Sequence, residues 1–177
     1  ANGIYENCPN DEAHKLFKLP DFITKMMENK WYGSKTGQGF YKKEGANILS
    51  LDLNSMEYRA PKKASFATLE LTKTIDKPIN RFKVLIKGTD KAGEFYRKSF
   101  AGLFAYVSNR VPEISDELYK IDDAMKAGFG WENGPFEIWD AIGVANGIEI
   151  MKAEGLVPAA WVTDMLASGT SSFYSIK

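Results

Sequence analysis

One apolar stretch constrains this chain more than any other, because it has the length and the period of a core helix. Between Asp90 and Asn109, large apolar residues recur at close to heptad spacing, namely Phe95, Tyr96, Phe100, Leu103, Phe104 and Val107. Residues three and four apart lie on one face of an α-helix, so this segment predicts a long helix that ends before Pro112. We expect it at the centre of the fold, with other helices packed around it.

Shorter segments with the same period surround this helix. Residues 65–88 have a helical pattern that is interrupted near Pro78, where a helix cannot continue unbroken. Beyond residue 112, serine and glycine residues suited to caps and stops delimit further helices. Those boundaries are an N-cap at Ser115, a stop at Gly128, a start at Gly134-Pro135, and stops at Gly143, Gly155 and Gly169. The chain is therefore expected to be mainly α.

The first part of the chain combines a short helix with a small β element. Residues 20–28 carry apolar side chains at helical spacing, namely Phe22, Ile23, Met26 and Met27. The glycine-rich residues 33–39 must turn, and beyond them apolar and polar residues alternate on both sides of Asn54-Ser55. This alternation predicts a β-hairpin or meander near residues 39–60. We expect two parts in one compact unit, residues 1–60 and residues 61–177.

A short internal repeat links the two parts. Residues 22–27 match residues 161–166 position by position, and an aromatic pair follows each segment, Phe40-Tyr41 and Phe173-Tyr174. The tetrapeptide of residues 1–4 also recurs, at residues 145–148. Matches in the same order predict two related units, of which the first begins partway through its repeat. Its apolar helix face should then be covered by the second unit or by another copy of the chain.

Composition argues against several functional classes. The 23 basic and 23 acidic side chains leave no net charge, so no overall field attracts nucleic acid or an anionic membrane. No apolar run reaches the length of a membrane span. The single cysteine, Cys8, cannot form a disulfide within the chain, which favours a reducing, cytoplasmic location.

Residue chemistry alone nominates no catalytic, cofactor-binding or metal-binding residue. His14, the only histidine, lies among polar residues, where a solvated side chain is expected rather than a general base. One histidine and one cysteine cannot supply a zinc shell. The glycine-rich residues 33–39 and 128–134 lack the strand, turn and helix context of a phosphate-binding loop. We interpret Glu137 and Asp140 as solvated carboxylates on one helix face.

Two motifs carry a resemblance to a known family. Residues 31–41, Trp-Tyr-Gly-Ser-Lys-Thr-Gly-Gln-Gly-Phe-Tyr, resemble the signature near the end of the helical domain of 3-hydroxyacyl-CoA dehydrogenases. Residues 121–130, 134–137 and 140–143 together resemble the other signature of that domain. The order of the motifs implies the C-terminal region of the long bacterial form, in which the helical unit is duplicated behind a dinucleotide-binding domain.

The resemblance implies an enzyme of fatty-acid β-oxidation. Such an enzyme oxidises a 3-hydroxyacyl-CoA to the 3-oxoacyl-CoA, with a histidine base removing the hydroxyl proton while hydride passes to NAD. In that family, the NAD-binding glycines and the catalytic histidine–glutamate pair lie in the upstream dinucleotide-binding domain. This chain alone is then expected to be inactive, and its implied partners are that domain, the acyl-CoA substrate and a second copy in a homodimer.

The resemblance leaves this chain a supporting role in the acyl-CoA cleft and at a domain or dimer interface. The candidate contacts are Trp31, Lys35, Phe40 and Tyr41. Asn109-Arg110 has the letters of the family's asparagine-arginine motif but lies in the second unit at a shorter spacing, so a catalytic role of Asn109 stays open. The alternative is a non-catalytic helical interaction module that has kept the fold and lost the enzyme. An upstream glycine-rich strand–turn–helix followed by a histidine–glutamate pair would favour the enzyme.

Overall fold

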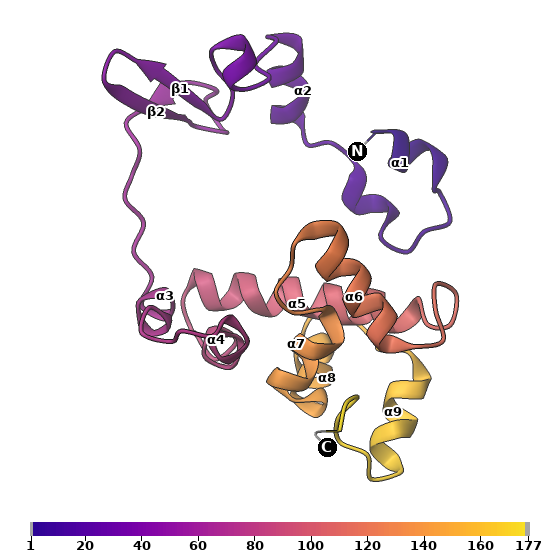
Figure 1. Cartoon of the computed structure of the whole chain (residues 1–177). Coiled ribbons are helices and arrows are strands. Elements are labelled where there is room, and N and C mark those ends of the chain that lie inside the picture. Colours follow the sequence, from indigo (N-terminus) through magenta and orange to yellow (C-terminus); the bar gives the residue numbers. More distant parts are fainter. Residues whose placement is uncertain (1, 176–177) are drawn as a thin grey trace. The chain divides into compact units, whose positions relative to one another are not determined.

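The computed structural model describes residues 2–175, which divide into two compact units between Ala64 and Ser65 (Figure 1). Unit 1 precedes this boundary and unit 2 follows it. The described residues are mainly α-helical and contain a small three-stranded antiparallel sheet, which confirms the predicted fold class. Within residues 2–175, no helix has both the length and the apolar character needed to cross a membrane.

Unit 1 consists of short helices followed by the sheet. α1 (Asn2–Asn7) and a 3-10 turn (His14–Phe17) precede α2 (Asp21–Glu28). The sequence predicts α2 over residues 20–28, and the helix begins one residue later, with Pro20 at its N-cap. A second 3-10 turn (Ser34–Thr36) lies in the glycine-rich segment. The strands are β1 (Tyr41–Glu44), β2 (Asn47–Leu51) and β3 (Tyr58–Arg59), paired in the order β1-β2-β3.

The sheet lies within residues 39–60, where the sequence predicts a β-hairpin or meander. β1 and β2 pair around a turn at Gly45, whose φ of +59° suits glycine. The apolar alternation itself does not extend to β1, whose residues are Tyr-Lys-Lys-Glu. The predicted turn at Asn54-Ser55 is present. The Asp52 carboxylate accepts the amides of Asn54 and Ser55, at 3.0 and 3.3 Å, so the chain turns directly after β2.

Unit 2 is a group of helices around the predicted long helix. The helices are α3 (Ala67–Thr72), α4 (Pro78–Leu85), α5 (Lys91–Asn109), α6 (Leu118–Phe129), α7 (Pro135–Ile142), α8 (Val144–Ala153) and α9 (Ala160–Ala167). The long α5 packs against α8, α7 and α4, which confirms its expected central place in this unit.

The boundaries of α6 differ from those expected. Ser115 does not cap this helix; its hydroxyl accepts the Glu117 amide at 3.1 Å in the turn before it. The helix continues through Gly128, where a side chain would meet open space, so nothing in the surroundings requires a stop. It ends instead at Gly130, whose φ of +67° is a left-handed conformation that glycine adopts without steric cost.

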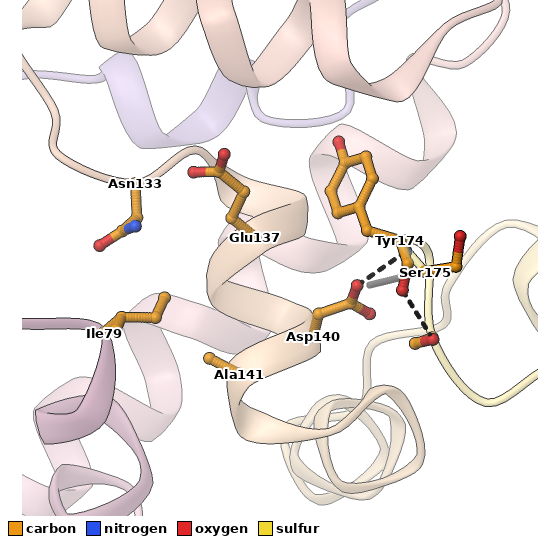
Figure 2. A pocket seen from close by; sticks show the side chains of 8 residues that line it. Ile79, Asn133, Glu137, Asp140, Ala141, Tyr174 and Ser175 are labelled. Atoms are coloured by element: carbon orange, nitrogen blue, oxygen red, sulfur yellow. Dashed lines mark hydrogen bonds between the residues drawn. The ribbon is translucent and has the colours of Figure 1, made fainter. Parts of the chain in front are cut away.

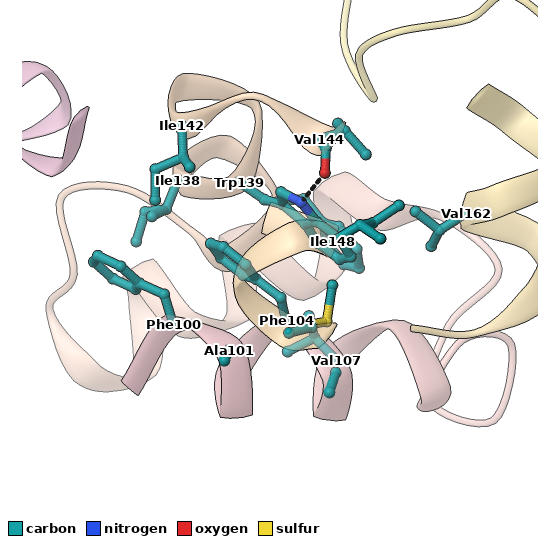
Figure 3. Packing of buried hydrophobic residues seen from close by; sticks show 13 residues of the cluster. Phe100, Ala101, Phe104, Val107, Ile138, Trp139, Ile142, Val144, Ile148 and Val162 are labelled. Carbon is teal, nitrogen blue, oxygen red and sulfur yellow. Dashed lines mark hydrogen bonds between the residues drawn. The ribbon is translucent and has the colours of Figure 1, made fainter. Parts of the chain in front are cut away.

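The core of unit 2 combines aliphatic side chains with a stack of aromatic rings between α5 and α7 (Figure 3). The centroids of Phe100 and Phe104 lie 5.7 Å apart, and those of Phe104 and Trp139 lie 4.7 Å apart with nearly parallel planes. Trp139 is fully buried, and its indole nitrogen donates to the Val144 carbonyl at 3.0 Å. The ring stack and this hydrogen bond hold α5, α7 and α8 together.

Asp90 ties the start of α5 to α3. Its carboxylate accepts the amides of Ala92 and Gly93, both at 3.1 Å, as the N-cap of α5, and the amide of Thr68 at 3.0 Å. These hydrogen bonds, the one from Thr68 foremost, lower the pKa of Asp90 to about 2.

We expect acid to weaken this link between α3 and α5. A carboxyl group whose pKa is lowered by folding stabilises the protein above its unfolded pKa, here 3.8, and that contribution is lost as the pH falls toward the folded pKa. An Asp90→Asn variant keeps a capping oxygen but does not titrate. Melting curves at about pH 5 and about pH 2 should therefore differ less for this variant than for the wild type.

The matched control for this experiment is Asp164→Asn, at an exposed position of α9. We expect this variant to show the acid sensitivity of the wild type. Identical pH dependence of the Asp90→Asn variant and the wild type would show that Asp90 does not link folding to protonation.

Candidate functional site

The predicted contact residues lie in unit 1, where two of them border a small apolar cavity. The cavity has a volume of about 190 Å³ and is lined by Ile23, Met26, Met27, Trp31, Tyr32, Gly33, Gly39 and Phe40. The exposed Lys35 lies in the 3-10 turn, and Tyr41, 66% exposed, opens β1. The structure therefore brings Trp31 and Phe40 together at this cavity and leaves Lys35 and Tyr41 outside its lining.

The glycine and threonine residues of the first motif close the loop that carries Phe40. A Cβ atom at Gly39 would lie 2.7 Å from the Cα of Gly33, so only glycine permits this approach. Gly33 donates its amide to the Gln38 carbonyl at 2.9 Å. The Thr36 hydroxyl accepts the Tyr32 amide at 3.0 Å. These contacts bring the chain back to α2, where the ring centroids of Phe40 and Phe22 lie 6.4 Å apart.

A buried carboxylate in unit 2 organises the start of α7. Asp122, only 1% exposed, accepts the amides of Phe136 at 2.9 Å and Glu137 at 3.1 Å. It also accepts the Tyr174 hydroxyl at 2.8 Å, which ties the C-terminal segment to α6. Burial raises the pKa of Asp122, and the three donors act in the opposite direction.

Two further carboxylates on α7 also bind backbone groups. Asp140 accepts the amide of Phe173 at 2.8 Å and that of Tyr174 at 2.9 Å, and Figure 2 shows the second of these hydrogen bonds. Burial raises the pKa of Asp140. Glu137 accepts the Gly134 amide and the Lys126 ammonium, both at 2.8 Å. Burial acts to raise the pKa of Glu137, but these two donors lower it overall.

The interpretation of Glu137 and Asp140 as merely solvated carboxylates is therefore wrong. Their partners are distant along the chain and leave no local pattern, because Asp140 and Tyr174 lie 34 residues apart and Glu137 and Lys126 lie 11 apart. The one available signal was the repeated Phe-Tyr pair, whose second copy is the pair that Asp140 binds.

An open cavity of about 630 Å³ lies beside these groups, bordered by α4, α7 and the C-terminal segment (Figure 2). Its lining consists of Ile79, Asn133, Glu137, Asp140, Ala141, Ser172, Tyr174 and Ser175. The Tyr174 hydroxyl, whose pKa is raised by burial and by Asp122, is an anchor rather than an acid. Ser172 donates its hydroxyl to the Tyr174 carbonyl at 3.0 Å. These hydrogen bonds attach the C-terminal segment to α6 and α7. Among the residues described, they assemble no activated nucleophile.

The remaining residues considered for chemistry also have packing roles. His14 is half-buried rather than solvated, and its ring stacks on Tyr5 with centroids 4.3 Å apart. The Asn109 amide donates to the Ala105 carbonyl of its own helix at 2.9 Å. In the described part of the chain, no group of three or more histidine, cysteine or acidic side chains is placed to hold a metal ion.

Curated proteins that match this chain are named as a 3-hydroxyacyl-CoA dehydrogenase and as fatty acid oxidation complex enzymes. Over 174 residues the chain is 38% identical to a 3-hydroxyacyl-CoA dehydrogenase of Bacillus subtilis, a match that covers 98% of this chain and 22% of that protein. It is 28% identical over 133 residues to a fatty acid oxidation complex trifunctional enzyme of Rickettsia felis, covering 73% of this chain and 17% of that protein. A Rickettsia prowazekii protein of the same name is 25% identical over 142 residues, a match that covers 78% of this chain and 18% of that protein.

The chain thus spans about a fifth of the length of the curated relatives it matches. No family model matches it, and no solved structure does. The expected resemblance is confirmed by the first of these matches, which extends over nearly the whole chain. This chain is therefore similar, almost from end to end, to one segment of the Bacillus subtilis 3-hydroxyacyl-CoA dehydrogenase.

Proposed function

We propose that this chain is a C-terminal, non-catalytic part of a cytoplasmic 3-hydroxyacyl-CoA dehydrogenase of fatty-acid β-oxidation. The observation that carries the proposal is the 38% identity over 98% of the chain to the Bacillus subtilis dehydrogenase. The whole enzyme would oxidise a 3-hydroxyacyl-CoA to the 3-oxoacyl-CoA and transfer the hydride to NAD. The base and the NAD site would lie in an upstream dinucleotide-binding domain.

The geometry of the carboxylates supports a structural role for this segment. Asp122 and Asp140 each accept backbone amides, and Glu137 is ion-paired with Lys126. A general base must be able to reach a substrate proton. Carboxylates that cap backbone amides serve the fold instead, and the stacked ring of His14 packs on Tyr5.

The surface of unit 1 supports a role at a domain or dimer interface. Trp31 and Phe40 border an apolar cavity, and Phe40 is 47% exposed. Apolar surface of this kind is typical of contact regions. Within the proposal, this cavity meets another part of the enzyme, and the exposed Lys35 and Tyr41 beside it are candidates for the rim of the acyl-CoA cleft.

The same exposed cavity is what favours the second candidate, a helical interaction module without enzymatic activity. The two candidates differ in the longer protein that contains this segment. If this segment belongs to the enzyme, the longer protein reduces NAD. If it is an interaction module, the longer protein reduces no NAD.

NADH absorbance with a 3-hydroxyacyl-CoA and NAD tests the proposal. We expect the longer protein to form NADH and the 177-residue chain to form none. The His14→Ala variant of the longer protein should retain activity, because His14 packs on Tyr5. Turnover by the 177-residue chain that disappears with His14→Ala would overturn the proposal, and an inactive, folded longer protein would favour the interaction module.

A further inference from the structure

The helices α2 and α9 end with the same backbone geometry. The amides that follow each helix donate to the corresponding carbonyls of its last turn, at 2.8 and 3.0 Å after α2 and at 3.2 and 3.0 Å after α9. Both endings place one residue in the left-handed region, Lys30 with a φ of +58° and Gly169 with a φ of +90°. The repeated sequence therefore has a repeated local structure.

In each unit, the phenylalanine of the aromatic pair that follows the helix contacts the first residue of the matched segment. The ring of Phe40 contacts Phe22 at 6.4 Å, and the ring of Phe173 contacts Trp161 at 5.8 Å. Phe22 and Trp161 are the first residues of the two matched segments. Each unit thus contains an equivalent helix, the same hydrogen-bonded helix end, and a phenylalanine that packs back on that helix.

In unit 2, α7 covers the aromatic pair Phe173-Tyr174. The ring of Phe173 lies 5.2 Å from Phe136 and 5.1 Å from Trp139, in edge-to-face geometry. The carboxylate of Asp140 accepts the amides of Phe173 and Tyr174. One helix therefore supplies two aromatic residues three positions apart, followed directly by an aspartate.

In unit 1, the corresponding surface is open. Phe40 and Met27 are each 47% exposed, and the cavity of about 190 Å³ lies between them and Trp31. The α-helices described in this unit are α1 and α2, so no counterpart of α7 is found among them. Uncovered apolar surface next to a preformed cavity is typical of a docking site.

We propose that this cavity receives a helix of the α7 kind from a part of the enzyme outside this chain. The helix carries the pattern aromatic-x-x-aromatic-Asp; its rings cover Phe40, and its carboxylate accepts the Phe40 amide. The α7 helix of a second copy cannot serve, because Phe173 and Tyr174 of its own chain already occupy it. The proposal rests on the proposed function, because relatives about five times as long as this chain leave room for such a helix.

Hydrogen–deuterium exchange at the Phe40 amide tests the proposal, with the 177-residue chain compared with the longer enzyme. We expect exchange to be about tenfold slower, or more, in the longer enzyme, because the amide is bonded and covered there. Equal exchange in the two proteins would overturn the proposal. Slowing in the 177-residue chain that increases with its concentration would instead assign the cavity to a second copy and would also overturn it.

A pair of variants separates docking from local stability. Met27→Lys should lower the melting temperature of the longer enzyme but not that of the 177-residue chain, where Met27 is half exposed. The control Leu16→Lys, at a position 83% exposed and outside the cavity, should change neither. An equal effect of Met27→Lys on both proteins would contradict docking. NADH formation is measured on the same samples, so an active enzyme without protection at Phe40 would reject the docked helix and leave the proposed function standing.

Discussion

Replacing Asp122 by alanine should destabilise unit 2 by about 3 kcal/mol or more. The substitution removes the acceptor for two amides at the start of α7 and for the Tyr174 hydroxyl. The Phe136 amide and its neighbours lie in the interior, where an unpaired donor is costly. Urea unfolding followed by circular dichroism measures the change in the free energy of unfolding.

The adjacent residue provides a matched control for this variant. Asp123 is exposed and forms a surface ion pair with Lys126 at 3.0 Å, so Asp123→Ala should cost about 0.5 kcal/mol or less. An Asp122→Asn variant, which keeps one acceptor and the volume, should fall between the two. Equal losses for Asp122→Ala and Asp123→Ala would show that the buried network does not hold α6, α7 and the C-terminal segment together.

Adding a single methyl group at Gly147 should destabilise unit 2 by about 3 kcal/mol. A Cβ atom there would lie 2.1 Å from the indole nitrogen of Trp139, which is fully buried and cannot move aside. The clash would also disturb the hydrogen bond from that nitrogen to the Val144 carbonyl. Urea unfolding followed by tryptophan fluorescence reports both the stability and the environment of the ring.

The opposite result is expected at another helical glycine. Gly102 in α5 is exposed, and a Cβ atom there would meet nothing within 4 Å beyond the backbone of its own helix. Gly102→Ala should therefore stabilise unit 2 by up to about 1 kcal/mol through helix propensity alone. If Gly147→Ala were as well tolerated as Gly102→Ala, the close packing of α8 on Trp139 would be refuted.

The elements that could be predicted from sequence are those with strong local signals. The heptad-like spacing of α5 and the Gly134-Pro135 start of α7 both depend on residues close together in the chain, and both predictions are confirmed. The apolar alternation located the sheet but did not extend to β1. The stop of α6 was misplaced at Gly128 because backbone conformation, rather than residue type, selects Gly130.

The carboxylate network could not be predicted in the same way. Asp122 and Tyr174 are 52 residues apart, and their contact depends on how α6, α7 and the C-terminal segment pack. Aspartate and glutamate side chains on a helix surface are usually solvated, so the sequence gives no sign of other partners. Only the packed structure shows that Asp140 binds two amides. The repeated aromatic pair was visible in the sequence, but its meaning required the contacts of Phe173.

Asp122, Glu137 and Asp140 bind backbone groups of the chain itself, and we propose that the chemistry lies elsewhere in the enzyme. The most direct measurement is a crystal structure of the longer enzyme with a 3-hydroxyacyl-CoA and NAD bound. We predict that the substrate hydroxyl lies beyond hydrogen-bond distance of His14, Asp122, Glu137 and Asp140, with Asp140 still bound to the Phe173 and Tyr174 amides. A substrate hydroxyl within hydrogen-bond distance of any of these four side chains would contradict these packing roles.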